Sequence, residues 1–467
     1  MNLQGGNILE KSKVIDNVKG IKNIVDDLSI KVWENPEIAG EERYASGLFK
    51  DILKNNGFSI KVINNMEYAF IAEFGSGHPV IAVLGEYDAL AGMSQNLETI
   101  HSPIVLNGSG HGCGHNLLGS AALGSVLAIK KYMEETNKKG TIRFYGCPEE
   151  ETLIGKVKMI KEGAFEGCDL ALSWHPMNAN AAVYNAYLSN NSIKFNFTGK
   201  SAHAGATPHL GRSALDAVEL MNVGANYLRE HVIDKARIHY TITKAGGPPN
   251  IVPKEAESWY FVRAPHRKDV EEITQRLYKV ADGAAMMTET AVEKNLISGC
   301  YELLPNDTLF ELTHKNMEEI SGPEYSEGDL KFARDLQKSI NTSQIQADMA
   351  LYGQKGEELE DPVHQGVVDK NAAKIVNITG SSDSGDVSWI MPMNCFLTAC
   401  FPWGVTPHSW QATASAGSGI GLAGMLYAAK LFTGIMYDLL NDEELVRKAI
   451  DEFNERTKTN KYLSPIS

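Results

Sequence analysis

Three short, mostly apolar runs in the first half of the chain constrain its fold more than any other feature. They span residues 79–84, 140–146 and 169–173, and each has the length and composition of a buried β-strand. A run with helical periodicity at 117–133 separates the first two. Strands that alternate with helices in this way predict an α/β protein built on a mainly parallel sheet.

Polar residues follow each of these predicted strands. Asp88 comes after the first strand, Glu149, Glu150 and Glu151 come after the second, and His175 comes after the third. In open α/β sheets, ligands bind outside the carboxyl ends of the strands. The sequence therefore predicts that these side chains converge at one edge of the sheet, although a run of glutamates is more often a solvated surface.

A thiol and an imidazole lie two residues apart in the glycine-rich segment His-Gly-Cys-Gly-His-Asn at 111–116. The apolar run behind this segment predicts a helix with Asn116 as its N-cap. Cys113 and His115 would then lie at a helix N-terminus, where the partial positive charge of the free amide groups favours a thiolate. Thiolate and neutral imidazole both bind metal ions. The alternative is an inert buried thiol beside an unrelated histidine.

Considered together, these residues indicate a metal site. Carboxylates, a thiol and imidazoles recur at the same end of successive strands. Neighbouring carboxylates suit a division of labour, in which one binds the metal and the next accepts a proton from metal-held water. The residues alone leave open, by one position, which members of the 149–151 run take these roles.

The pattern changes after residue 190. From there to residue 302 the expected elements follow in the order βαββαβ, which is the ferredoxin-like arrangement. This predicts a domain at 191–302 inserted between two parts of a catalytic domain, at 1–190 and 303–467. Two turns of the insert contain His203 and Asn250, polar groups that a turn does not require. The polar stretch 322–379 carries no functional prediction.

Charge and composition exclude several classes of partner. The formal net charge is −14, so the chain offers no basic surface for nucleic acid or an anionic membrane. It shows no signal peptide and no apolar run long enough to span a bilayer. We therefore expect a cytoplasmic protein whose six cysteines are reduced.

The string Gly-Ile-Gly-Leu-Ala-Gly at 419–424 matches the dinucleotide-binding fingerprint. It follows serine and alanine residues rather than a clear strand, so close packing of a buried helix is the better interpretation. On this string rests the rival hypothesis of a dinucleotide-dependent oxidoreductase.

Six motifs occur in the order of a known family. They are His-Gly-Cys-Gly-His, Pro-Glu-Glu-Glu, Trp-His-Pro, Gly-Lys-Ser-Ala-His-Ala, Asn-Ile-Val-Pro and a late His-Ser at His408. With them the chain resembles, over nearly its whole length, the dinuclear metallo-amidohydrolases of the aminoacylase and carboxypeptidase G type, and most of all the group of the B-type aminobenzoyl-glutamate hydrolase subunits. The resemblance implies a metallopeptidase-type α/β domain, with a mixed, mainly parallel sheet flanked by helices. It also implies that the insert is a lid and dimerisation domain.

The resemblance further implies a role for each matched residue. Two divalent metal ions, Mn²⁺ by preference and Zn²⁺ as the alternative, would be held by Cys113, His115, Glu151, His175 and His408. Glu150 would be the general base, and Asp88 would support the metal site. From the insert, His203 would stabilise the oxyanion, while Asn250 and Arg263 would bind the substrate. A surface ion pair on a strand is the alternative for Arg263. Many relatives have aspartate where this chain has Asn116.

The activity implied by the resemblance is metal-dependent hydrolysis of the amide bond of an N-acyl amino acid or a dipeptide-like substrate. The best match is p-aminobenzoyl-glutamate. The alternatives are a dipeptidase for dipeptides with basic residues and an inactive metal-binding homologue that serves as a partner subunit. The insert would have to close to complete the site. It would also form a homodimer, and the other possibility is a heteromer with a related protein.

Overall fold

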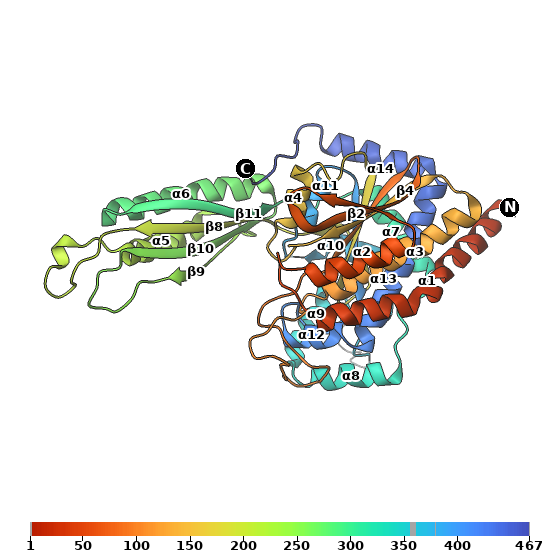
Figure 1. Ribbon diagram of the computed structural model, residues 1–467, viewed down its shortest axis with the longest axis horizontal. Coiled ribbons are helices and arrows are strands. Elements are labelled where there is room, and N and C mark those ends of the chain that lie inside the picture. The colour runs from red at the N-terminus through yellow and green to blue at the C-terminus, as the bar shows by residue number, and fades with distance from the viewer. Residues whose placement is uncertain (1, 355–360, 379, 467) are drawn as a thin grey trace. The chain divides into compact units, whose positions relative to one another are not determined.

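The computed structural model describes residues 2–354, 361–378 and 380–466 (Figure 1). The chain folds into two compact units. Unit 1 comprises Met1–Asn185, Leu304–Asn377 and Val387–Tyr462, and unit 2 comprises Ala186–Leu303, Ile378–Asp386 and Leu463–Ser467.

Unit 1 is built on a seven-stranded mixed sheet. Its strands are β1 (Ser59–Ile63), β2 (Met66–Ser76), β3 (Val80–Glu86), β4 (Gly140–Cys147), β5 (Leu170–Met177), β6 (Ala181–Val183) and β13 (Met393–Ala399), in the spatial order β1-β2-β4-β3-β5-β13-β6. The neighbours β4, β3, β5 and β13 pair in parallel, whereas β1, β2 and β6 pair antiparallel. The prediction of a mixed, mainly parallel sheet is confirmed.

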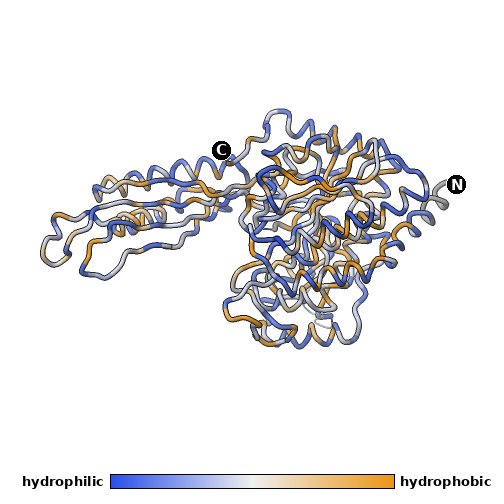
Figure 2. Tube along the Cα trace, in the orientation of Figure 1, coloured by the Kyte–Doolittle hydropathy of each residue, from blue (hydrophilic) through white to orange (hydrophobic). Residues whose placement is uncertain are grey.

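Helices bury this sheet. α3 (His115–Thr136) and α13 (Gly419–Asn441) pack against its central strands, and α1 (Asn2–Glu34) packs on both helices. Every residue of β3 is buried, because a parallel sheet covered on both faces needs continuous apolar strands. Figure 2 shows hydrophobic segments concentrated among the central strands of this unit.

The remaining helices lie around this core or in the connections. They are α2 (Arg43–Asn55), α4 (Gly155–Lys161), α7 (Asp307–Glu319), α8 (Glu327–Gln337), α9 (Thr342–Leu351), α10 (Lys370–Ile375), α11 (Ser384–Ser388), α12 (Trp410–Ala416) and α14 (Glu443–Arg456). Two short strands, β7 (Asn185–Ala186) and β12 (Asn377–Ile378), pair with each other in a separate small sheet.

The glycine string at 419–424 begins α13. A Cβ atom on Gly424 would lie 2.5 Å from the carbonyl oxygen of Ala399, so the glycine permits the close approach that the sequence suggested. By length and composition α13 is the one helix of the described chain that is able to cross a membrane, contrary to our expectation of none. In the most apolar 18-residue stretch of α13, 72% of the residues are buried, as in a core helix.

Unit 2 contains a four-stranded antiparallel sheet in the order β11-β8-β10-β9. Its elements are β8 (Ser189–Thr198), α5 (Ala214–Leu228), β9 (Arg237–Lys244), β10 (Glu255–Ala264), α6 (Arg267–Thr288) and β11 (Ala291–Cys300). The order βαββαβ was predicted and is confirmed. Both helices cover one face, because Ile193, Phe195 and Phe197 of β8 point into the core that the helices share with the sheet.

The segment without a functional prediction, 322–379, holds the turn that precedes His408. Gln344 of α9 donates through Nε2 to the carbonyl oxygen of Gly404 (2.8 Å), and Asp348 accepts the backbone N–H of the same glycine through Oδ2 (2.8 Å). Just after β5, Asn178 donates to the carbonyl oxygens of Pro402 and Val405. Side chains from two distant segments therefore fix this turn.

Replacing Asp348 by Asn should make unfolding less dependent on pH. Burial raises the pKa of Asp348 from 3.8 to about 6. Between these values the unfolded chain ionises this group and the folded chain does not, so the wild type loses stability as pH rises through the window. The amide of the variant would keep an acceptor for the N–H of Gly404 without this loss. We expect the variant to gain on the order of 2 kcal/mol relative to wild type between about pH 4 and pH 6.5.

Urea unfolding at about pH 4 and about pH 6.5 measures the difference in free energy of unfolding between the variant and the wild type. Asp451→Asn, at an exposed position on α14, is the control. A stability difference between Asp348→Asn and wild type that does not change with pH would contradict the assignment.

Candidate metal centre

The carboxyl ends of the parallel strands bring the predicted ligands together. Asp88 follows β3, Glu150 and Glu151 follow β4, His175 lies near the end of β5, and Cys113 and His115 lie where α3 begins. Three groups in this cluster have potential ligand atoms within 4.8 Å of one another. They are Cys113, His115 and His175; Cys113, Glu151 and His408; and Glu86, His115 and Glu150.

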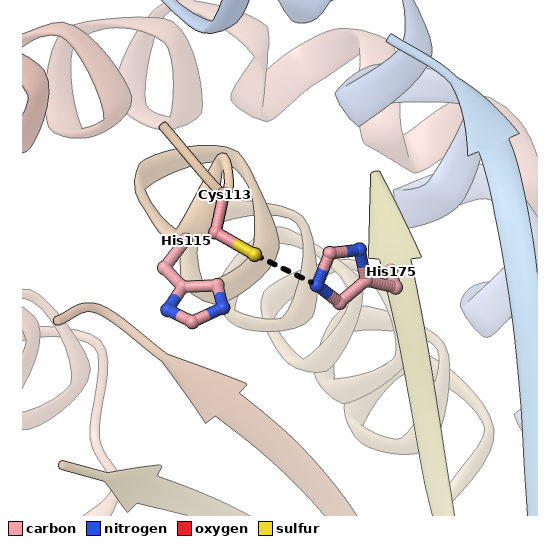
Figure 3. Close-up of side chains that lie close together, drawn as sticks. All are labelled: Cys113, His115 and His175. Carbon is pink, nitrogen blue, oxygen red and sulfur yellow. Dashed lines mark hydrogen bonds between the residues drawn. The ribbon is translucent and has the colours of Figure 1, made fainter. Parts of the chain in front are cut away.

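Cys113 and His175 face each other across the first group. Figure 3 shows the sulfur of Cys113 directed toward the ring of His175, and the distance from Sγ to Nε2 is 3.4 Å. The other ring nitrogen of His175 lies 2.9 Å from the carbonyl oxygen of Pro176. An N–H at Nδ1 donates to that oxygen, which leaves the lone pair of Nε2 directed at the cluster.

Asp88 orients two parts of the centre at once. Its Oδ1 lies 2.8 Å from Nδ1 of His115 and accepts that ring proton, while its Oδ2 accepts the backbone N–H of Glu151 (2.8 Å). Nε2 of His115 is buried and has no hydrogen-bond partner in the described part of the chain. This is the arrangement of a metal-binding histidine whose second nitrogen is held by a carboxylate.

Glu151 and His408 form the other side of the cluster. Nε2 of His408 lies 3.3 Å from Oε2 of Glu151. The second oxygen, Oε1, is buried without a hydrogen-bond partner among the residues described. His408 has a left-handed backbone (φ 61°) and donates its N–H to the carbonyl oxygen of Gly112 (2.9 Å). That bond ties the late turn to the Cys113 segment.

Gly114 allows Cys113 and His115 to be aimed at one point. It has φ 78°, and a Cβ atom there would lie 2.8 Å from Cγ of Pro176. The prediction of Asn116 as the N-cap was wrong, because α3 begins at His115 and Gly114 takes the N-cap position. The amide of Asn116 instead donates to Oγ of Ser29 (3.0 Å) and to the carbonyl oxygen of Ala416 (3.1 Å).

Sequence reasoning missed two buried charges in this centre. Glu86, the last residue of β3, lies with Oε1 2.7 Å from Nζ of Lys156 and with Oε2 3.4 Å from Nε2 of His115. Glu86 precedes Asp88 by two residues at a strand end, so it was a detectable candidate. Lys156 carries no comparable signal, because only the folded chain pairs it with Glu86.

The surroundings of the adjacent carboxyl groups of Glu150 and Glu151 shift their pKa values in opposite directions. Burial raises the pKa of Glu150, and the nearby charge of Glu86 raises it further. For Glu151, burial also raises the pKa, but the hydrogen bond with His408 and the charge of His115 outweigh it and lower the pKa to about 2. Neighbouring carboxyl groups that are driven apart in this way suit one proton acceptor and one permanent anion.

The donor set fits a divalent cation. Burial raises the pKa of Cys113, and Glu151 adds to this effect. A thiolate at this position therefore needs a positive charge beside it, which a bound metal ion provides. Sulfur, imidazole nitrogen and carboxylate oxygen are all ligands of Zn²⁺, and the nitrogen and oxygen ligands also suit Mn²⁺.

Three predicted residues belong to unit 2. Nδ1 of His203 accepts the backbone N–H groups of Gly205 (3.2 Å) and Ala206 (3.0 Å), so its ring proton is on Nε2. The turn of Asn250 lies beside it, since the N–H of Ala204 donates to the carbonyl oxygen of Asn250 (2.9 Å). Arg263 lies on β10.

Comparisons with known proteins agree with this architecture. Residues 189–286 match the model of the peptidase dimerisation domain. The B-type subunit of p-aminobenzoyl-glutamate hydrolase from Escherichia coli (strain K12) is 40% identical over 97% of this chain and 96% of its own length. The Xaa-Arg dipeptidase of Mus musculus is 29% identical over 60% of this chain and 65% of that protein. A dinuclear metal-binding peptidase of the M20 family from Bacillus subtilis has the same fold, with a TM-score of 0.54, 16% identity and coverage of 89% of this chain and 98% of that one.

Replacing Cys113 by Ala should lower metal content more than replacing His408 by Ala. Cys113 belongs to two of the ligand groups, and His408 belongs to one. After loading with Mn²⁺ and desalting, elemental analysis should find almost no metal in Cys113→Ala and about half the wild-type content in His408→Ala. Cys168→Ala, which removes a thiol outside the cluster, should bind as much metal as the wild type. Equal losses of metal from Cys113→Ala and His408→Ala would contradict the prediction that the sulfur of Cys113 serves both ligand groups.

Proposed function

The chain belongs to the M20 family of metallopeptidases and amidohydrolases, and from this premise we propose that it hydrolyses p-aminobenzoyl-glutamate or a closely related N-acyl amino acid. As a member of the family it is a metal-dependent enzyme that cleaves amide bonds. The substrate proposal is supported by the similarity to the B-type subunit of p-aminobenzoyl-glutamate hydrolase along 97% of the chain. The observation that carries the chemistry is the pair of the buried Glu150 and the half-buried Glu151 beside the candidate ligand groups that share Cys113.

We assign the ligands to two cations. One would be held by Cys113, His115 and His175 and the other by Cys113, Glu151 and His408, with the sulfur shared. Mn²⁺ is the proposed metal, from the resemblance to the B-type hydrolase subunits, and Zn²⁺ is the alternative that a thiolate ligand favours. Asp88 would hold His115 in the tautomer that leaves Nε2 for the metal.

The residues of the chain divide the reaction between them. Bound divalent cations would polarise the scissile carbonyl and lower the pKa of water toward about 7. Glu150 would accept the proton of the attacking water and return it to the leaving nitrogen, a role supported by its raised pKa. Glu151, with a pKa of about 2, would remain an anion throughout.

Residues of unit 2 are proposed to contact the substrate. His203 carries its proton on Nε2 and would donate it to the oxyanion. Asn250 lies in the adjacent turn and would bind the substrate beside it. Arg263 forms no salt bridge with any described carboxylate, which supports a role in binding a carboxylate of the substrate.

Replacing Glu150 by Gln should remove turnover and leave the metal content unchanged. The amide keeps the shape of the side chain but cannot accept a proton, so kcat should fall by about 10²- to 10⁴-fold. Glu149→Gln is the matched control, because Oε2 of Glu149 is bound by Nζ of Lys158 (2.5 Å) instead of joining the cluster. If Glu149→Gln loses activity and Glu150→Gln keeps it, the base lies one residue earlier.

The substrate class is decided by one panel of assays on the Mn²⁺-loaded protein. The panel contains p-aminobenzoyl-glutamate, other N-acyl amino acids and dipeptides with a basic residue. Preference for the last class would favour the activity that the Xaa-Arg dipeptidase name describes. Metal binding without cleavage of any compound would instead indicate an inactive partner subunit.

We also propose that unit 2 forms a homodimer. On α5 the apolar side chains of Leu220, Val223 and Tyr227 are exposed at helical spacing, on the side away from the buried Val218 and Met221. The strand β9 is the edge of the sheet and also exposes apolar side chains. An open strand edge and an apolar helix face are typical of interfaces between copies. The match of residues 189–286 to the peptidase dimerisation domain supports dimerisation through unit 2.

Replacing Tyr227 by Glu should convert the dimer to a monomer. This side chain is 75% exposed in the single chain, so a charge there would cost little in the monomer and much in an apolar interface. Light scattering measures the mass, and Val62→Glu, at an exposed position of β1 in unit 1, is the control. A wild type that is monomeric alone and assembles only with a related protein would establish the heteromer instead.

A cytoplasmic location is proposed as well. The six cysteines, all of which the structure describes, form no disulfide bond. This fits a reducing compartment.

A further inference from the structure

The sheet of unit 2 has one face without helices. On this face, polar residues lie at the beginning of β8 and at the positions of β10 and β11 paired with it. Residues of β8 alternate between the faces, so Asn190 and Ser192 point away from the core formed by Ile193 and its neighbours. Strand register places Asn190 between Arg263 of β10 and Cys300 of β11. Side chains at paired positions of adjacent strands share a face, with Cβ atoms about 5 Å apart.

Asn190 is completely buried but does not use its hydrogen-bonding groups. Its relative exposure is 0% in the folded chain. Neither Oδ1 nor Nδ2 has a hydrogen-bond partner among the described residues. An unpaired buried polar group is costly and rare in native proteins, and two on one side chain require an explanation.

Its neighbour Arg263 is also incompletely paired. Nε of Arg263 is buried without a hydrogen-bond partner in the described chain, and the guanidinium lies over the ring of Phe261, 5.5 Å from its centroid. Burial lowers the pKa of Arg263, and Cys300 offsets only part of this effect. A cation and an amide thus occupy neighbouring positions on one face of the sheet, and each has hydrogen-bonding atoms that no described residue pairs.

We propose that Asn190 and Arg263 together bind the α-carboxylate of the amino-acid part of the substrate, and that Asn190 sets the preference for that group. A carboxylate accepts from Nδ2 of Asn190 and from the guanidinium, which pairs both open donors at once. An α-amino acid unit also carries an N–H beside its carboxylate, which matches the open acceptor Oδ1. This proposal rests on the proposed amidohydrolase function and adds a residue to it.

Binding of a simple probe to the Mn²⁺-loaded protein tests the pair. Calorimetry would compare L-glutamate with its α-amide, which lacks the α-carboxylate. We expect the wild type to bind glutamate about 10- to 100-fold more tightly than the amide, as charged hydrogen bonds do. Asn190→Asp, which has the same shape, should abolish this preference, because its carboxylate occupies Arg263 and repels the ligand.

A second variant and a control separate binding from folding. Asn190→Ala should lose a comparable part of the preference, and the loss should not add to that of Arg263→Ala if both contact one carboxylate. Asn196→Ala, on the same strand and face, should bind like the wild type. The proposal is overturned if Asn190→Asp keeps the preference for glutamate. It is also overturned if the Asn190 variants bind glutamate and the amide equally more weakly and have a lowered melting temperature. The side chain of Asn190 would then only support the fold or hold a water.

The two proposals can fail separately. If the wild type cleaves the N-acyl amino acids but KM does not respond to Asn190→Asp, the carboxylate pair is wrong and the hydrolase function stands. If the wild type cleaves none of the panel yet binds glutamate through Asn190, the substrate proposal is wrong and the pair stands.

Discussion

The paired hydrogen bonds of Asp88 are the constraint on which the metal centre depends. One carboxylate oxygen holds the ring of His115 and the other holds the backbone N–H of Glu151. A single buried side chain after β3 therefore fixes the beginning of α3 and the turn after β4 relative to each other. In a low-dielectric interior such bonds are strong, and breaking either one leaves an unpaired buried carboxylate oxygen. The proposed geometry, a general base beside a metal ligand, follows from this arrangement.

Much of the fold was predictable because strong periodicity survives in the sequence. The six elements of unit 2 follow the predicted order βαββαβ, and all six lie in the part of the chain where the sequence pattern changes. The strands β1 and β2 were missed, since β1 is largely exposed and carries no apolar run. The helices α8 and α9 were also missed, because α9 buries only Ile345 and Met349 and so shows little periodicity.

The residues of the candidate site also fall into those that the sequence predicts and those that it does not. Residues that stand in short motifs, such as Cys113 and His115, were found because local spacing carries the signal. Lys156 and Asn190 were not found, because their significance lies in pairing across strands and in burial, which only the folded chain supplies. Asn116 shows the reverse error: its local context suggested a helix cap, but contacts with Ser29 and Ala416, far away in the sequence, use its amide.

The unequal burial of the proposed ligands gives the two halves of the candidate centre different access to water. The side chain of His408 is 54% exposed, whereas that of His115 is fully enclosed. An ion exchanges when water replaces its ligands one after another. Of these two imidazoles, solvent reaches only that of His408 directly. The cation beside Glu151 and His408 would thus be the labile one, replaced as the surrounding ion supply changes, while its inner neighbour is retained. With ions bound as proposed, such a difference in exchange rate would favour a centre with two different metals.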